Sequence, residues 1–419
     1  MKRLFVIATA LALAACDQRA AVAEMARCNR ELGSADAHLA SAQAAQAAAE
    51  RKAQALEDEL RATREQLAAL KAGGATATAA APAPASATDQ VLPATLLPPP
   101  AAAPERSGRR LKVGVSLPVR EERWVKDKLT MLAEAKKRNI DLLVQISEND
   151  PAKQLAQCES MIAQGIKVLI VAPNDATAAA AIVDRAVRAG VQVISYDRLI
   201  LDSPHDYYYL SFDNVKVGEL QGEWLTHRIP KGNYIVLSGA PTDNNAKLVK
   251  QGGMKYVQPL VDRGDVKIVF ESPVKDWSPD EAERLCNQAL SESGNNVQGV
   301  LTPNDGTGGG CVKALAAAGL AGKVPVTGQD GDLAAAMRIV KGEQGMTVFK
   351  DTRLLGKAAL EIAEAVGRGR AYETGGRTIS NNKRAVKAVL LAPALVTKDN
   401  LDERLIKSGY LSRAAVYRK

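Results

Sequence analysis

The chain has 419 residues, 46% of them hydrophobic, so it is long enough for two or three folded units with sizeable cores. Lysine and arginine outnumber aspartate and glutamate by 55 to 47. The excess is spread along the chain without the dense basic runs of nucleic-acid-binding proteins, so we interpret it as a solvated surface and expect no nucleic-acid partner. The sequence holds neither C-x-x-C nor H-E-x-x-H, and its three histidines are scattered, which argues against a metal site and a histidine-dependent hydrolase.

The N-terminus has the features of an export signal. Lys2 and Arg3 precede an apolar stretch over residues 4–15, which is too short to span a bilayer permanently. The stretch ends in Leu-Ala-Ala-Cys, which resembles the bacterial lipobox, so we expect a signal peptide over 1–16 and a diacylglycerol on Cys16. The lipid would hold the body of the protein in the periplasm, and Asp17 slightly favours the inner membrane. An ordinary signal peptide with an accidental cysteine is the alternative.

Residues 17–71 and 72–110 look like a tether. From Met25 to Leu70, apolar residues recur at alternating spacings of three and four, which predicts a coiled coil through which the chain could form a homo-oligomer. A single alanine-rich helix is the alternative. Residues 72–110 are rich in alanine, proline, threonine and serine, which predicts an extended linker.

Beyond the linker, short apolar runs alternate with amphipathic stretches, which predicts an α/β fold of parallel sheets buried on both faces. We expect two doubly wound lobes, with a TIM barrel as the competing architecture. The expected strands span 112–117, 141–146, 168–172, 191–196, 234–237, 266–270, 297–301 and 324–327, with a short β-like run at 346–349.

Polar and aromatic side chains follow the expected strands, where ligands bind in open α/β sheets. Carboxylates, amides and cationic groups bond sugar hydroxyls, and indoles stack on the apolar faces of a pyranose, so the set suits a neutral sugar. A helix N-cap is the competing role for each Asp or Asn, and we expect Asp243, Asp305 and Asp332 to be caps. The residues after the strands are Glu122, Arg123, Trp124, Asp197, Arg198, Asp243, Asn244, Asn245, Asp276, Trp277, Asn304, Asp305, Asp330, Asp332 and Lys350.

Residues 111–410 resemble the periplasmic sugar-binding family of type I fold, with order and spacing matched across both lobes. One departure is that this chain reads Ser-Leu-Pro-Val over 116–119, where related receptors carry acidic residues, so one hydroxyl contact at that rim is expected to be lost. The matching segments are Glu122-Arg-Trp-Val-Lys-Asp127, Tyr196-Asp-Arg-Leu-Ile200, Ser211-Phe-Asp-Asn-Val-Lys-Val-Gly-Glu-Leu-Gln221, Asp243-Asn-Asn-Ala-Lys-Leu248, Asn304-Asp305, Gly328-Gln-Asp330 and Thr347-Val-Phe-Lys350.

The resemblance implies two lobes joined by a three-segment hinge near 213, 347 and 385. The N-lobe would comprise 111–213 and 348–384, and the C-lobe 214–347 and 385–412. Trp124 and Trp277 would sandwich the sugar between them. The side chains implied to bond it are Arg123, Arg198, Asn245, Asn304, Asp330 and Lys350.

The function implied is capture of a monosaccharide, D-xylose in particular, by lobe closure, and its delivery to the permease of an ABC importer. Presentation of the closed form to a membrane receptor kinase is the alternative. We expect no enzyme and no cofactor: the glycine-rich stretch 306–310 resembles a dinucleotide fingerprint, but Cys311 stands where its last glycine would be. We also expect Cys158, Cys286 and Cys311 to be separate buried thiols, with a Cys286–Cys311 disulfide as the alternative.

Overall fold

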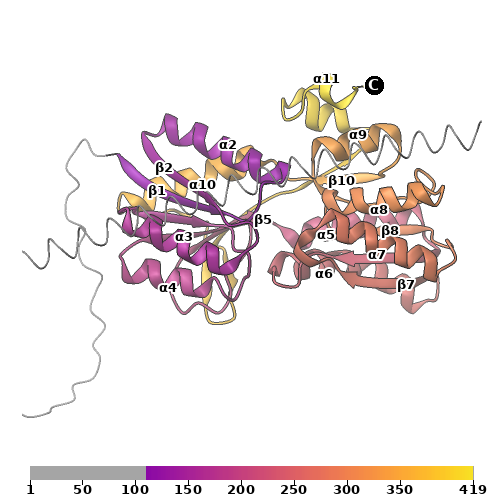
Figure 1. Ribbon diagram of the computed structural model, residues 1–419, viewed down its shortest axis with the longest axis horizontal. Helices are drawn as coiled ribbons and strands as arrows, with labels where there is room; N and C mark the ends of the chain where they lie inside the picture. Colours follow the sequence, from indigo (N-terminus) through magenta and orange to yellow (C-terminus); the bar gives the residue numbers. More distant parts are fainter. Residues whose placement is uncertain (1–109, 419) are drawn as a thin grey trace, which may run out of the picture. The chain divides into compact units, whose positions relative to one another are not determined.

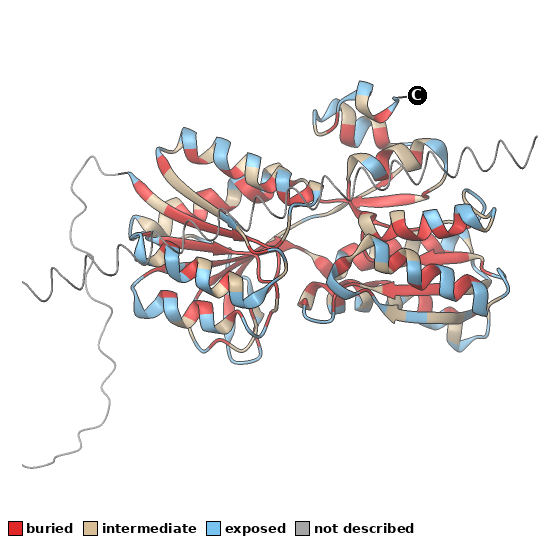
Figure 2. Ribbon diagram, viewed as in Figure 1, coloured by how far each residue is buried: buried red, intermediate tan, exposed pale blue. Residues whose placement is uncertain are grey.

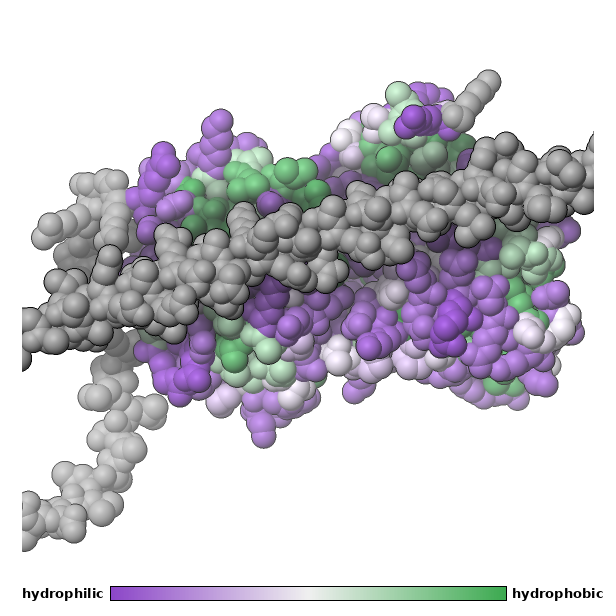
Figure 3. Space-filling view, viewed as in Figure 1, coloured by the Kyte–Doolittle hydropathy of each residue, from purple (hydrophilic) through white to green (hydrophobic). Residues whose placement is uncertain are grey.

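The computed structural model describes residues 110–418, which form two α/β lobes (Figure 1). The expected signal peptide, Cys16, coiled coil and linker therefore lie outside the described residues. Within residues 110–418, every helix is too short or too polar to cross a membrane. Figure 3 shows a mainly hydrophilic surface on the visible face, with an apolar stripe over one helix, α2 (Glu122–Lys137), where Val125, Leu129 and Leu132 are exposed.

The N-lobe is built on one seven-stranded sheet with the order β11-β12-β5-β4-β3-β1-β2. Its strands are parallel except for β11, which runs antiparallel to β12. They span Leu111–Leu117 (β1), Ile140–Ile146 (β2), Val168–Val171 (β3), Gln192–Tyr196 (β4), Tyr208–Phe212 (β5), Thr378–Ser380 (β11) and Ala385–Leu391 (β12).

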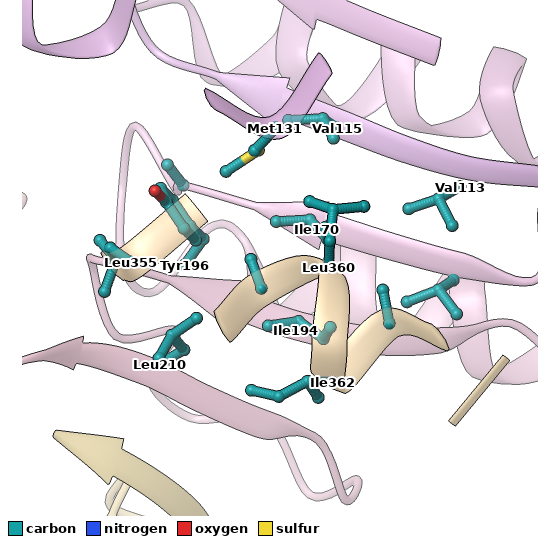
Figure 4. Packing of buried hydrophobic residues seen from close by; sticks show 14 of the residues in the cluster. Val113, Val115, Met131, Ile170, Ile194, Tyr196, Leu210, Leu355, Leu360 and Ile362 are labelled. Atoms are coloured by element: carbon teal, nitrogen blue, oxygen red, sulfur yellow. The ribbon is translucent and has the colours of Figure 1, made fainter. Parts of the chain in front are cut away.

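Helices cover both faces of this sheet, as its continuous apolar strands require. On β3, Val168 and Ile170 join the core under α2 and α10 (Thr352–Gly367), whereas Leu169 and Val171 join the core under α3 (Pro151–Ala163) and α4 (Ala180–Arg188). Successive residues of a strand point to opposite faces, so each residue of β3 is buried. Figure 2 shows the resulting buried sheet between half-exposed helices, and Figure 4 the packing on the α10 side.

The C-lobe contains two three-stranded sheets, β7-β6-β8 and β13-β10-β9. Their strands span Gly232–Ser238 (β6), Val266–Pro273 (β7), Gly299–Leu301 (β8), Gln329–Asp330 (β9), Met346–Phe349 (β10) and Ala394–Thr397 (β13). The helices span Asn214–Arg228 (α5), Asn244–Asp262 (α6), Pro279–Glu292 (α7), Asp305–Ala317 (α8), Leu333–Lys341 (α9) and Arg413–Val416 (α11), with a 3-10 turn at Lys275–Trp277 (η1) and a π-helix at Asp402–Lys407 (η2).

The sheets differ from the expected parallel pattern in three respects. Both β11–β12 and β10–β13 are antiparallel pairs, so the sheets are mixed. The apolar run 324–327 is not a strand, because Pro325 lacks an N–H and only Val326 forms a bridge, to Val300. The strands β5, β9, β11, β12 and β13 were not predicted.

The chain passes between the lobes after β5, after β10 and after β12. The third passage lies between Leu391 and Ala394, not near 385 as expected from the sequence. The physical reason is that β12 pairs with β5 from Lys387 to Leu391, five of its seven residues, and buries Val386 and Ala388 in the N-lobe core.

The prediction of separate thiols at Cys286 and Cys311 is wrong, because the two residues form a disulfide between α7 and α8. These helices lie side by side, which brings the two Cα atoms to 5.3 Å, within the range that a disulfide bridges. Cys158 is a buried free thiol, as expected, and burial raises its pKa to about 12.

Candidate functional site: a polar cavity between the lobes

A cavity of about 210 Å³ lies at the carboxyl ends of the strands, walled by residues of both lobes. The structure brings together in its wall all eight side chains that the sequence singled out for a sugar. They are Arg123, Trp124, Arg198, Asn245, Trp277, Asn304, Asp330 and Lys350. Every one of them is at most 9% exposed, so their polar groups must be satisfied by each other or by a ligand.

Arg123 links carboxylates of both lobes. Its Nη2 lies 2.5 Å from Asp197 Oδ2 and its Nη1 lies 3.4 Å from Asp330 Oδ1, while its Nε donates to Asp127 Oδ2 at 3.3 Å. Burial disfavours the charged guanidinium, but these carboxylates outweigh burial and raise the pKa of Arg123 well above its ordinary value. The guanidinium is therefore a fixed cation whose orientation is set by its carboxylate partners.

Lys350 directly follows β10 and pairs with the same two cavity carboxylates. Its Nζ lies 3.0 Å from Asp330 Oδ1 and 3.9 Å from Asp197 Oδ2. Burial opposes ionisation of Asp197, yet the two nearby cations lower its pKa to about 2. Asp197 is therefore a buried carboxylate that stays ionised at any physiological pH.

Arg198 and Asp243 form a second ion pair across the cavity, with Nε 2.9 Å from Oδ2. Asp243 is also the N-cap of α6, as expected, because its Oδ1 accepts from the Asn245 N–H at 2.9 Å. The same carboxylate accepts the indole N–H of Trp277 at 3.2 Å. One side chain thereby caps the start of a helix, pairs with a cation and fixes the orientation of an aromatic ring.

Two indoles line the cavity from different lobes. Trp124 lies against both arginines, with guanidinium carbons 4.7 Å (Arg123) and 5.3 Å (Arg198) from its ring. Trp277 packs against the backbone at Gly239, where a Cβ atom would lie 2.2 Å from the ring. The two guanidinium groups restrict rotation of the Trp124 ring, and the backbone at Gly239 restricts rotation of the Trp277 ring.

Asn304 and Asn245 contribute side-chain amides, and some of the hydrogen-bonding groups of these amides already have partners in the protein. Asn304 Oδ1 accepts from the Thr307 N–H at 2.9 Å in a capping box at the start of α8, which leaves its amide nitrogen as the donor for a ligand. Asn245 Nδ2 donates to the Asp197 carbonyl at 3.0 Å. These bonds fix both amides in one orientation before any ligand enters.

Strained backbone is concentrated at the cavity. Ten described non-glycine residues have positive φ, and five of them line this cavity. Such conformations cost free energy and persist where the surroundings enforce them, which is typical of ligand sites. The five are Asn149, Asp197, Asp276, Trp277 and Asp330.

Two expected caps have other roles. Asp305 is buried, and its Oδ2 accepts from the backbone of Gly331 and Asp332 and from the Thr347 hydroxyl, so it ties β9 to β10 instead of capping α8. Burial raises its pKa to about 7. Asp332 occupies the N-cap position of α9 but makes no side-chain capping bond. The sequence placed Asp305 correctly after β8, but Asp332 follows β9 and not the strand expected over 324–327, and the bonds of neither residue were predicted.

Sequence reasoning missed several wall residues. Glu121 lies at the N-cap position of α2 without capping it, and burial raises the pKa of its carboxyl. Glu121 places a carboxylate next to Val119, in the region where the sequence predicted the loss of an acidic contact. Asn149 lies in a turn after β2, where only a preference of asparagine for left-handed backbone could have signalled it. Of the other wall residues outside the eight, Glu122, Asp197, Asp243, Asp276 and Asp332 were expected at strand ends but not as sugar contacts, whereas Val119, Pro279, Gly306 and Gln329 were not predicted as site residues.

A buried polar cavity between two α/β lobes that the chain connects three times defines a ligand-binding protein of the type I periplasmic fold. Among the described residues, no group of histidine, cysteine or carboxylate side chains could hold a metal ion. The chain belongs to the periplasmic binding protein family: the family model described as periplasmic binding protein domain matches residues 113–371.

Relatives and solved structures support this assignment over most of their length. The D-xylose-binding periplasmic protein of Haemophilus influenzae is 40% identical over 308 residues, which cover 73% of this chain and 92% of that protein. Its Escherichia coli counterpart is 39% identical over 72% and 91% of the two chains. A Chloroflexus aurantiacus carbohydrate transporter solute binding protein, solved with D-glucose, is 33% identical with a TM-score of 0.69, covering 73% of this chain and 98% of that one.

Proposed function

We propose that this protein captures a neutral monosaccharide, D-xylose in particular, by closure of its two lobes and delivers it to the permease of an ABC importer. The observation that carries the proposal is the charge pairing of the cavity. Its three buried cations each lie beside a carboxylate: Arg123 beside Asp197, Arg198 beside Asp243 and Lys350 beside Asp330. A wall with paired charges favours an uncharged, polyhydroxylated ligand over a sugar acid or phosphate, which would add an unpaired buried charge.

The size of the cavity supports a single sugar ring. At about 210 Å³ it lies below the ~300–1,000 Å³ of pockets for drug-sized ligands. Trp124 and Trp277 would stack on the two faces of the ring while the polar residues bond its hydroxyls. The names of two relatives, both D-xylose-binding proteins, support the pentose.

Calorimetry with the purified chain tests the ligand. We expect D-xylose to bind more tightly than D-glucose, because the hexose carries an extra hydroxymethyl group, and D-xylonate to bind far more weakly, because its carboxylate would be an unpaired charge. Equal affinities for D-xylose and D-glucose would contradict the pentose assignment. Preference for D-xylonate would contradict the neutral-ligand assignment.

Deletion of the gene tests the role in the cell. Loss of D-xylose uptake is the expected result for an importer receptor, whereas intact uptake with loss of a sugar-induced response would favour a sensor. We further propose a lipid on Cys16. Metabolic labelling with a fatty acid should mark the wild-type chain and not Cys16→Ser, and a labelled variant would contradict the anchor.

A further inference from the structure

Helix α9 of the C-lobe begins without a cap of its own. Asp332 stands at its N-cap position but makes no side-chain bond to the helix. The first backbone N–H of α9, that of Leu333, instead donates to Glu122 Oε1 at 2.9 Å. Glu122 is the first residue of α2, in the N-lobe. A carboxylate of one lobe therefore caps a helix of the other, where the helix dipole also favours negative charge.

A second contact holds Glu122 in place and touches the C-lobe itself. Lys126, one turn further along α2, places its Nζ 2.7 Å from Glu122 Oε1. The same ammonium lies 4.3 Å from the ring centre of Tyr410, which packs against Phe349 in the C-lobe core. One turn of α2 thus presents an oriented anion and a cation to two different elements of the other lobe.

These contacts differ in kind from those of the sugar cavity. Glu122 borders the cavity, but its two resolved polar contacts are with the protein, whereas the next two residues, Arg123 and Trp124, are in the set expected to hold the sugar. The bond to α9 exists only while the lobes are together. Its free energy therefore favours the closed arrangement whether or not a sugar is present.

We propose that Glu122 is an inter-lobe cap that stabilises the closed arrangement and so raises the affinity for every ligand by the same factor. The inference rests on the proposed function for its link to sugar affinity. A ligand that binds only the closed form has an apparent affinity proportional to the population of that form. Losing an N-cap of ordinary strength should lower that population, and the affinity with it, by about 2- to 30-fold.

The test uses Glu122→Ala and Glu122→Gln in the full chain. Glu134→Ala is the matched control, because Glu134 lies on the same helix and pairs with Lys137 of its own lobe. Calorimetry should show Glu122→Ala weakened about 2- to 30-fold toward D-xylose and toward D-glucose alike, with an unchanged ratio of the two affinities. Glu122→Gln should lose less, because its amide oxygen can still accept from Leu333. The control should bind as the wild type does.

Two outcomes of the calorimetry would overturn the proposal: unchanged affinity in Glu122→Ala, or a loss confined to one sugar, which would make Glu122 a direct ligand contact. A spin-label distance between the lobes supplies a readout that needs no sugar. Without ligand, Glu122→Ala should shift the distribution toward longer distances relative to the wild type and the control. If no sugar binds the wild type, the proposed function fails, but the distance measurement still tests whether Glu122 holds the lobes together. A distribution that does not shift in Glu122→Ala would contradict the inter-lobe cap. Thermal melts identify a variant that has not folded, in which case Glu122→Gln carries the test.

Discussion

Arg123 of the N-lobe and Asp330 of the C-lobe meet across the cavity, with Nη1 3.4 Å from Oδ1. The two residues are 207 positions apart in the chain, and each is 6% exposed. Their contact means that the wall of the site is continuous only when both lobes contribute to it.

Loss of the Asp330 carboxylate should reduce sugar binding. Asp330→Asn is the preferred change, because Asp330 has a φ of 109° and asparagine tolerates positive φ better than alanine does. The substitution leaves Lys350 and Arg123 with one carboxylate partner fewer. Each buried donor left unpaired costs about 1–3 kcal/mol, so the affinity for D-xylose should fall at least tenfold. Calorimetry checks the affinity and circular dichroism the fold. A folded variant with undiminished affinity would remove Asp330 from the site.

The position of the Trp277 ring should control affinity. In Gly239→Ala the new Cβ would lie 2.2 Å from this ring, so the indole must move. Gly345→Ala is a matched control, because its Cβ would lie 2.1 Å from the ring of Trp224, which is not part of the cavity wall. Both variants should melt at a lower temperature, but only Gly239→Ala should bind sugar more weakly. Equal affinities in the two variants would argue against a stacking role for Trp277.

The Cys286–Cys311 disulfide should stabilise the C-lobe. Closing a loop of this length, with a sequence separation of 25, contributes about 2–4 kcal/mol to the free energy of unfolding. Dithiothreitol should therefore lower the urea midpoint of the wild type and of Cys158→Ala, which keeps the disulfide. It should not affect the double variant Cys286→Ala/Cys311→Ala. A wild-type midpoint that does not respond to the reductant, with the bond shown to be reduced by thiol titration, would contradict this expectation.

Stability should fall as the pH rises from about 4 to 6, in part through Asp127. Burial raises the pKa of Asp127 to about 6, although Arg123 and the Tyr196 hydroxyl both bond to its ionised form. The unfolded chain has a pKa near 3.9, so the folded state binds the extra proton. Protonated Asp127 therefore contributes up to ~3 kcal/mol to the free energy of unfolding. This contribution is complete below pH ~4 and is lost as the pH rises through about 6.

Urea unfolding between pH 4 and 7 measures this dependence. Asp127→Asn should flatten the fall relative to the wild type, whereas Asp262→Asn, a change at an exposed carboxylate, should not. An Asp127→Asn profile parallel to that of the wild type would show that other groups carry the pH dependence.

The fold and the site could be predicted where the signal is local. Strands such as β1 and β3 are buried on both faces, so their apolar runs are unmistakable, and the residues that follow them meet at one sheet edge because the strands are parallel. The family resemblance supplied the sugar-contact roles proposed for the eight wall residues, whereas the strand ends alone left each Asp and Asn open between a ligand contact and a helix cap.

What escaped prediction depends on three-dimensional neighbours. The half-exposed β12 resembles a lobe boundary until its pairing with β5 is seen. The disulfide requires the distance between two helices, which no sequence spacing gives. Glu121 and Glu122 precede or begin a helix, where acidic residues are common for reasons of the helix dipole alone. Only the three-dimensional structure distinguishes Glu121, a wall residue, and Glu122, the proposed inter-lobe cap, from ordinary acidic residues at the start of a helix.

The order in which the N-lobe receives its parts has a consequence for biogenesis. Tyr208 of β5 pairs with Lys387 of β12, so one neighbour of β5 is synthesised after the C-lobe sheet β7-β6-β8. An emerging chain cannot complete the N-lobe sheet until nearly all of it has left the ribosome, and pairings this distant in sequence form slowly. A polypeptide that completes its sheet this late stays unfolded for longer during synthesis, which would favour the passage through a membrane translocon that the N-terminal sequence predicts.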